Sequence, residues 1–217
     1  MQKADSCWRP VAYASRSLTE TEKRYAQIEK EALAITWACE RFEDYILGKS
    51  ILIETDHKPL VPLFGQKDIG SLPPRIQRLR MRLMRFAFGI QHIPGNELHT
   101  ADTLSRAPLS SQQSKDEALL QDINIYTNFI CEGLPASDVR IEEIKFHQKE
   151  DEVTKTIMEC CLNEWPDRFH IPGIVKPYYS VKSELTVVEG ILMYGQRIVI
   201  PSALRLTMLD RLHEGHQ

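Results

Sequence analysis

Three acidic residues from distant parts of the sequence have the types and positions needed for metal-dependent chemistry. Asp56 follows an apolar run typical of a buried strand, Glu31 lies beside the apolar stripe of a helical pattern, and Asp102 lies in a short helical segment. Ligand sites of α/β sheets lie at the carboxyl ends of strands, where Asp56 is expected. Carboxylates converging there would suit Mg²⁺, with phosphate oxygens completing its shell. Spacing alone leaves open a second interpretation, in which all three are solvated surface acids.

A row of basic residues is the second candidate site. Residues 69–96 contain five arginines and no acidic residue. Four of them recur at steps of three and four, which places them on one helix face beside an apolar stripe: Arg75, Arg78, Arg82 and Arg85. Such a face could bind the phosphates of a nucleic-acid backbone without reading its sequence. The alternative is a solvated face that pairs with acids of the protein, and the sequence leaves both open.

Alternating strand and helix patterns predict an α/β fold that positions these residues. Thr19 and Glu22 form a capping box that opens a long helix, whose apolar stripe continues to Ile46 and stops at Gly48. The elements predicted after and around it are strands over 11–15, 50–55 and 88–93, a helix beginning at Pro74, and a short helix over 100–106.

The second half of the chain has a different composition. Residues 110–138 begin with a polar stretch typical of a linker. A small α+β segment follows, with helical patterns over 141–146 and 151–165. Residues 185–193 predict a hairpin that turns at Glu189 and Gly190, and a last helix is expected after Pro201.

Composition and charge narrow the class of protein. The chain has 217 residues and a net charge of −3, but residues 1–109 carry 16 Lys and Arg against 13 Asp and Glu. The excess of negative charge therefore lies in the second half. No apolar run is long enough to span a membrane. Five cysteines without a C-x-x-C pair do not suggest a disulfide framework, so an intracellular protein, cytoplasmic or nuclear, is expected.

Five motifs follow one another in the first half. They are Trp-Arg-Pro-Val-Ala-Tyr-Ala-Ser-Arg-Ser-Leu-Thr at 8–19, Tyr-Ala-Gln-Ile-Glu-Lys-Glu-Ala-Leu-Ala at 25–34, Glu-Thr-Asp-His-Lys-Pro-Leu at 54–60, Pro-Arg-Ile-Gln-Arg at 74–78 and Ala-Asp-Thr-Leu-Ser-Arg at 101–106. In this order they resemble the ribonuclease H domain of gypsy-type LTR retrotransposon polyproteins. The resemblance implies a ribonuclease H-like mixed sheet with packed helices, which cuts the RNA strand of RNA–DNA hybrids by two-metal hydrolysis with Mg²⁺ or Mn²⁺. It also implies that Glu31, Asp56 and Asp102 are three of the four metal-binding carboxylates.

The fourth carboxylate of the family lies in an Asp-Ala-Ser motif on the opening strand, and the sequence is expected to begin after it. Asp5 is no substitute, because it falls in a predicted turn before Trp8. In a two-metal site the missing carboxylate bridges both cations. We therefore expect metal affinity and turnover to collapse, and the incomplete sheet to expose an edge.

Short motifs near the end of the chain resemble the start of the integrase region of the same polyproteins. They are Ser-Glu-Leu at 183–185, Gly-Ile-Leu at 190–192, Arg-Ile-Val-Ile-Pro at 197–201 and Leu-His-Glu-Gly-His at 212–216. The resemblance implies that His213 and His216 are the two histidines of a His/His/Cys/Cys zinc domain. Its cysteines are expected beyond Gln217, so Zn²⁺ would bind only to a longer chain. Cys160 and Cys161 are interpreted as core or half-exposed thiols rather than ligands.

The sequence therefore predicts three parts: an incomplete ribonuclease H-like domain over 1–109, a linker over 110–138, and an integrase N-terminal extension with the beginning of a zinc-binding domain over 139–217. The predicted function is a fragment of a reverse transcriptase/ribonuclease H–integrase polyprotein with impaired hybrid hydrolysis. Its expected partners are RNA–DNA hybrid or other nucleic acid and the remainder of the polyprotein. The alternatives are a non-catalytic nucleic-acid-binding or interaction module derived from a retroelement, and a remnant that folds poorly.

Overall fold

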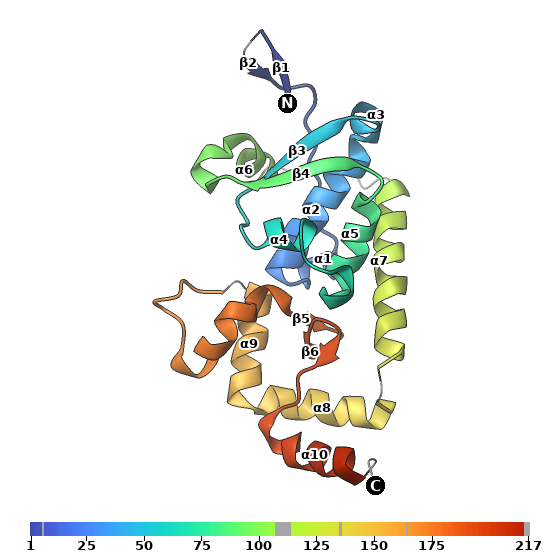
Figure 1. The fold of residues 1–217 in the computed structure, drawn as a ribbon, viewed down its shortest axis with the longest axis vertical. Helices are drawn as coiled ribbons and strands as arrows, with labels where there is room; N and C mark the ends of the chain where they lie inside the picture. Colours follow the sequence, from blue (N-terminus) through green and yellow to red (C-terminus); the bar gives the residue numbers. More distant parts are fainter. Residues whose placement is uncertain (6, 107–113, 135, 164, 215–217) are drawn as a thin grey trace.

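Helices interleaved with small sheets make up the part of the chain that the computed structural model describes, residues 1–5, 7–106, 114–134, 136–163 and 165–214 (Figure 1). Within these residues the strands form an antiparallel pair, a parallel pair and an antiparallel three-stranded sheet. The predicted α/β class is therefore observed. The three sheets do not join into the single mixed sheet that the resemblance implies.

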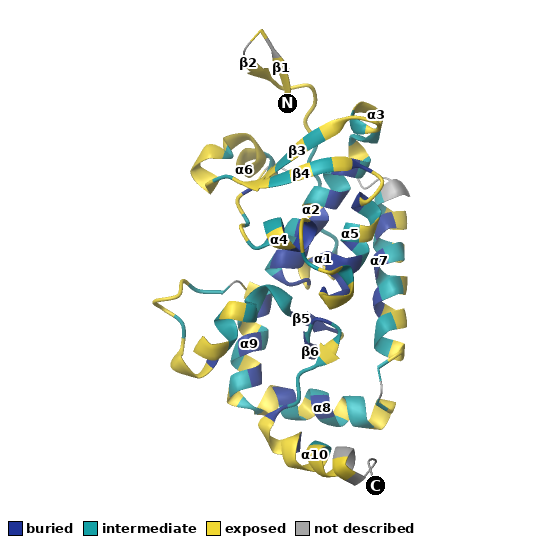
Figure 2. Ribbon diagram, viewed as in Figure 1, coloured by how far each residue is buried: buried dark blue, intermediate teal, exposed yellow. Residues whose placement is uncertain are grey.

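The two strands nearest the N-terminus, β1 (Gln2–Ala4) and β2 (Cys7–Arg9), form an exposed hairpin that projects from the molecule (Figures 1 and 2). Asp5 lies in its turn, as predicted, with a φ of 48°. Residues 10–19 that follow have neither helix nor strand, so the strand predicted over 11–15 is wrong. A strand needs a neighbour for its backbone hydrogen bonds, and no described strand lies beside this segment.

The parallel sheet positions the first predicted acid. Its strands β3 (Ser50–Thr55) and β4 (Ala87–His92) pair with Ile53 opposite Ile90. Both of these side chains pack against the core, whereas Leu52 on the other face is exposed. The prediction of strand 50–55 is confirmed with the same bounds. The crossover between the strands contains α4 (Leu60–Phe64), the 3₁₀ turn η1 (Ile69–Ser71) and α5 (Pro74–Leu83).

The long helix predicted from Thr19 to Ile46 is divided into α1 (Glu20–Lys23), α2 (Gln27–Arg41) and α3 (Glu43–Ile46). The capping box is confirmed, because Thr19 Oγ1 accepts a hydrogen bond from the Glu22 N–H at 3.2 Å and Glu22 Oε2 accepts one from the Thr19 N–H at 2.8 Å. The first break arises where Glu29 Oε2 accepts from the Ala26 N–H at 3.0 Å. This bond caps a new helix in place of continuing the old one.

Helix α7 (Ser114–Glu132) occupies most of the predicted linker, which is therefore wrong for residues 114–132. Its side chains Leu119 and Ile123 are buried, and the helix runs alongside α5 (Figure 1). The polar residues before this helix led to the prediction of a linker, although Leu119 and Ile123 are four residues apart, as on one face of a helix. Residues 110–113 of the predicted linker lie outside the described residues.

The remaining elements confirm the predicted hairpin. Glu189 and Gly190 turn it with positive φ values of 48° and 79°, as a tight hairpin turn requires.

The elements after α7 are α8 (Asp138–Glu150), α9 (Glu152–Asn163), η3 (Gly173–Glu184), β5 (Leu185–Val188), β6 (Ile191–Tyr194), β7 (Arg197–Ile198), η4 (Ser202–Leu204) and α10 (Arg205–Glu214). The helix η2 (Gly95–Glu97) and α6 (His99–Arg106) precede α7.

One apolar core crosses the predicted domain boundary. Ile28 and Ile76 of the first half belong to the same buried cluster as Ile123, Leu185 and Leu192 of the second. Figure 2 shows the buried residues gathered on α2 and α5 and on the faces of α7 and β5 beside them. Across the described ranges, none of the helices is both long and apolar enough to cross a membrane.

Candidate functional site

Asp56 lies directly after β3, at the carboxyl end of the parallel sheet, and is exposed. The loop that follows β4 comes close to it: a Cβ on Gly95 would lie 3.2 Å from Asp56 Oδ2. Backbone hydrogen bonding holds the two loops together, because the Ile93 N–H donates to the Thr55 carbonyl at 2.9 Å. The sheet thus places Asp56 at the edge where α/β ligand sites lie.

A cavity of about 240 Å³ lies beside Asp56, and both halves of the chain contribute to its wall. His57 lines it from the first half, and Trp165, Tyr179 and Lys182 line it from the second. Pockets for small molecules usually measure roughly 300–1,000 Å³. The cavity is below this range, so we assign it no ligand.

The other two predicted acids make local interactions. Glu31 lies on α2, is half-buried, and accepts a hydrogen bond from Gln27 Nε2 at 2.8 Å. Asp102 lies on α6, is exposed, and pairs with Arg106 one turn later, with a distance of 3.0 Å from Oδ1 to Nη2. Pairs of this kind on an exposed helix contribute little stability, about 0.3–0.5 kcal/mol.

Glu31, Asp56 and Asp102 do not come together as a metal site. Among the residues with described positions, no group of three or more His, Cys, Asp or Glu side chains could hold a metal ion. The arrangement does not fit Mg²⁺, which needs several oxygen ligands within about 2.1 Å. The metal-binding roles of these three residues therefore stay predictions.

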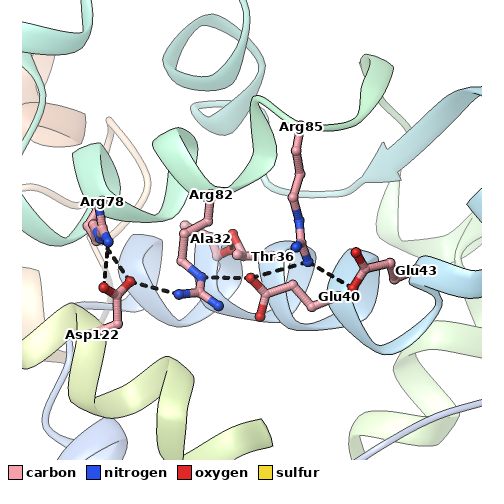
Figure 3. A network of polar contacts seen from close by, with 8 residues as sticks. All are labelled: Ala32, Thr36, Glu40, Glu43, Arg78, Arg82, Arg85 and Asp122. Carbon is pink, nitrogen blue, oxygen red and sulfur yellow. Dashed lines mark hydrogen bonds and ion pairs between the residues drawn. The ribbon is translucent and has the colours of Figure 1, made fainter. Parts of the chain in front are cut away.

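The predicted basic face is occupied by ion pairs (Figure 3). Arg78 Nε donates to Asp122 Oδ2 at 2.8 Å, and Arg82 Nη1 donates to the same oxygen at 2.8 Å. Arg82 Nε also donates to Glu40 Oε1 at 2.6 Å. Arg85 completes the row through a 3.1 Å contact with Glu43 Oε2. Neutralising carboxylates thus come from α2, α3 and α7, so the absence of acids within residues 69–96 does not leave these arginines unpaired.

The electrostatics of this row agree with its geometry. The hydrogen bond from Arg78 is the main cause that lowers the pKa of Asp122; burial opposes it, and Arg82 adds to it. The pKa of Arg78 is raised in turn by its bond to Asp122. A phosphate that approached Arg78 or Arg82 would have to displace a carboxylate already in place.

The fourth predicted arginine lies inside the protein. The side chain of Arg75 is 7% exposed, and its Nη1 is 3.1 Å from Oε2 of Glu29, which is fully buried. Burial by itself would lower the pKa of Arg75, but the Glu29 carboxylate and Tyr25 more than offset this and raise it. The prediction that Arg75 belongs to the same nucleic-acid-binding face is not supported by its burial.

Glu29 is the residue that the sequence interpretation missed. The signal was weak, because at 100° per residue position 29 lies roughly 90° from the centre of the predicted apolar stripe, and only the apolar Leu33 four residues later extends the buried face toward it. An acid that is buried there needs a partner. Its partners Arg75 and Thr186 lie 46 and 157 residues further along the chain.

The predicted zinc ligands are only partly described. His213 is exposed in the last turn of α10, and His216 lies outside the described residues. Cys161 is buried and Cys160 half-buried. Burial raises the pKa of Cys161 to about 12, so it is a protonated core thiol rather than a thiolate ligand.

Comparison with known proteins addresses the first half of the chain. Residues 1–86 match the family described as an RNase H-like domain found in reverse transcriptase. The first half is similar to the RNase H region of retrotransposon Pol polyproteins. No solved structure matches the chain.

Three relatives illustrate the similarity, all from Drosophila melanogaster. The retrovirus-related Pol polyprotein from transposon 297 is 39% identical over 107 residues, which are 49% of this chain and 10% of that protein. Its counterpart from transposon 412 is 40% identical over 97 residues, 45% of this chain and 8% of that protein. The one from transposon gypsy is 32% identical over 111 residues, 51% of this chain and 10% of that protein. The chain thus spans about a tenth of the length of these curated relatives.

Proposed function

We propose that residues 1–106 are the RNase H-like segment of a retrotransposon Pol polyprotein, and that this chain by itself hydrolyses RNA–DNA hybrids weakly or not at all. The observation that carries the first part is the match of residues 1–86 to an RNase H-like family of reverse transcriptases. The order along the chain agrees with it, since Glu31 lies on α2, Asp56 directly after β3 and Asp102 on α6.

The arrangement of the acids supports the second part. Two-metal hydrolysis needs carboxylates that hold two cations about 3.5–4 Å apart. Glu31 instead contacts its helix neighbour Gln27, and Asp102 contacts Arg106.

A cleavage assay tests this proposal. The purified chain is incubated with a DNA strand paired to end-labelled RNA, with Mg²⁺ or Mn²⁺, beside the variant Asp56→Asn. We expect both proteins to give the same background cleavage. Cleavage by the original chain that is lost in Asp56→Asn would contradict the proposal.

A non-catalytic nucleic-acid-binding module is the second candidate. The observation that favours it is the partial exposure of the row on α5: the Arg78, Arg82 and Arg85 side chains are 28%, 26% and 45% exposed. Because each already pairs with a carboxylate, we expect weak, strongly salt-dependent binding of a hybrid. Arg85→Ala, which removes the most exposed of the three arginines in this row, should weaken binding more than Arg106→Ala on α6. Equal binding of the two variants would leave this candidate without support.

We also propose that residues 139–217 correspond to the start of an integrase region, in which His213 and His216 supply two of the four ligands of a Zn²⁺ site. Four ligands are needed for a closed structural zinc site. Titration of the chain with Zn²⁺ against a chromogenic chelator should therefore show no tight site. A stoichiometric site lost in His213→Ala would contradict this.

A further inference from the structure

A buried polar cluster joins the two halves of the chain. We call it the polar latch, and it consists of Glu29, Arg75, Thr186 and the main-chain carbonyl of Val187. Thr186 Oγ1 donates to Glu29 Oε1 at 2.7 Å. Arg75 Nη1 donates to Glu29 Oε2 and to the Val187 carbonyl, each at 3.1 Å.

Strand β5 supplies two of the four groups of the polar latch, Thr186 and the Val187 carbonyl. The two charged groups of the latch, Glu29 and Arg75, lie on α2 and α5. Glu29 and Thr186 are fully buried, and Arg75 is 6% exposed. The face of Tyr25 completes the surroundings of the guanidinium, with the Arg75 Cζ 4.4 Å from the ring centre. A buried charge is costly unless most of its hydrogen bonds are made, and Arg75 Nε already has no partner, so Glu29 and Arg75 depend on β5 for part of the hydrogen bonding that remains.

Apolar packing surrounds the latch. Leu185 and Val187 of β5 share a buried cluster with Ile28, Ala32 and Ile76 of the first half. In Figure 1, β5 and β6 lie between α1 and α2 on one side and α8 on the other. The strand therefore covers the end of the α2–α5 pair as a core element would, rather than as a surface attachment.

Further polar contacts join the two halves outside the latch. Between the first half and α7, Trp37 Nε1 donates to Asp116 Oδ1 at 2.7 Å and the Tyr25 hydroxyl donates to Asn124 Oδ1 at 3.3 Å. Lys67 of the first half pairs with Glu184 of the second. Each of these contacts joins residues far apart in the sequence, so the surface is specific to this partner.

The turn between β6 and β7 approaches the first half closely. Gly195 has a φ of +57°, and a Cβ on it would lie only 2.8 Å from the carbonyl oxygen of Ser71. Only glycine fits there without displacing backbone. The two halves therefore meet backbone to backbone at this point.

We propose that residues 114–214 are a docking partner for residues 1–106, and that the two remain bound as a complex when the chain between them is cut. The apolar contacts supply the affinity and the polar latch supplies the register. The association of the two pieces does not depend on catalysis. For a chain released from a larger polyprotein by proteolysis, a cut between α6 and α7 would leave the assembly intact.

Controlled cleavage of the full chain tests the proposal. The recognition sequence of a site-specific protease replaces residues 109–113, and the purified protein is cut and applied to a gel-filtration column. We expect both pieces in one peak at the position of the uncut 25.0 kDa chain, with an unchanged helical circular dichroism signal. Separation of the pieces at micromolar concentration, or loss of the helical signal on cleavage, overturns the proposal.

The role of the latch is tested with Thr186→Val, which keeps the shape of the side chain and removes its hydroxyl. The matched control is Thr156→Val, because the Thr156 hydroxyl donates only to the Glu152 carbonyl of its own helix. In the cut protein we expect Thr186→Val to raise the dissociation constant by about tenfold and the control to leave it within about twofold. Equal dissociation constants for the two variants would overturn the role of the latch.

Discussion

Two acids that lie two residues apart on α2 have opposite environments, and they represent two regions of the molecule. Glu29 faces the shared core, where it is fully buried and bonded to Arg75 and Thr186. Glu31 is half-buried and accepts a hydrogen bond from Gln27 of the same helix. Partners far along the chain hold the first acid, and a neighbour on the same helix contacts the second. The long-range polar contacts described here therefore join the two halves of the chain, and they do not bring the predicted acids together near Asp56.

Arg75→Ala should have the largest effect on this comparison. It leaves the Glu29 carboxylate buried without its cation, and breaking a buried ion pair by removing one partner costs about 3–5 kcal/mol. We expect a loss of this size in the free energy of unfolding, measured by urea denaturation. A loss below about 1 kcal/mol, the size typical of surface substitutions, would show that the Glu29 carboxylate reaches water.

A double variant separates charge burial from packing. Replacing both members of a buried pair by apolar residues of similar size is often neutral. Glu29→Leu combined with Arg75→Met should therefore be more stable than Arg75→Ala.

Cys39 and Cys161, which belong to the shared core from opposite halves, test whether that core unfolds as one unit. Their reactivity toward a thiol reagent should rise together as urea increases, and separate transitions would contradict a single core.

Asp122→Asn should have an intermediate effect. Its carboxylate accepts hydrogen bonds from both Arg78 and Arg82 across the α5–α7 contact, and such networks at a partly exposed surface contribute about 1 kcal/mol. The expected loss in the free energy of unfolding is of this order. Glu117→Gln, at an exposed position of the same helix, makes the same change of charge and should have almost no effect. Equal effects would assign the loss to net charge rather than to the ion pairs.

Acid should destabilise the second half through Asp151. Burial by itself would raise the pKa of Asp151, but hydrogen bonds from Ser202, Thr154 and Val153 more than offset this and lower it to about 2. A carboxyl with a lower pKa in the folded state stabilises that state above its unfolded pKa, and this contribution disappears as pH falls through the folded value. Stability should therefore fall between about pH 4 and pH 2. In Asp151→Asn this part of the pH dependence should be absent, and an unchanged profile would contradict the assignment.

Substitutions at the predicted catalytic edge should have the smallest effects on stability. Asp102→Asn removes a contact within its own exposed helix, and Glu31→Gln keeps the size and most of the hydrogen-bonding groups of a half-buried side chain, so changes within about 0.5 kcal/mol are expected in urea unfolding. Mg²⁺ should not raise the melting temperature of the chain, because a ligand stabilises only a folded state that binds it. A clear rise in melting temperature with Mg²⁺ that is lost in Asp56→Asn would reveal an assembled metal site and would contradict the comparison.

Local patterns predicted several elements and turns correctly. Strand β3 has the predicted bounds, the Thr19 capping box is formed, and the hairpin turns at Glu189 and Gly190. The strand expected over 11–15 failed because a strand depends on a neighbour that its own residues do not specify. The long helix failed at Ala26, where Glu29 caps a new helix as it turns toward partners far along the chain.

The candidate sites were less predictable than the elements. Residue types alone identified the arginine row of α5, and spacing placed its members on one helix. Their partners could not be found in the same way, since Glu40, Glu43 and Asp122 come from three other helices. Residues 69–96 therefore have an excess of positive charge along the sequence, but carboxylates from other helices neutralise it on the folded surface.

The sequence by itself determined the similarity of the first half to RNase H-like domains, the α/β class and the turns, because motifs, apolar periodicity and glycine positions depend on neighbouring residues. Only the tertiary structure decided which acid is buried, which arginines are neutralised, and that the two halves share one core. Charge pairing and core packing depend on distances in space, and these join residues that are more than a hundred positions apart in the chain.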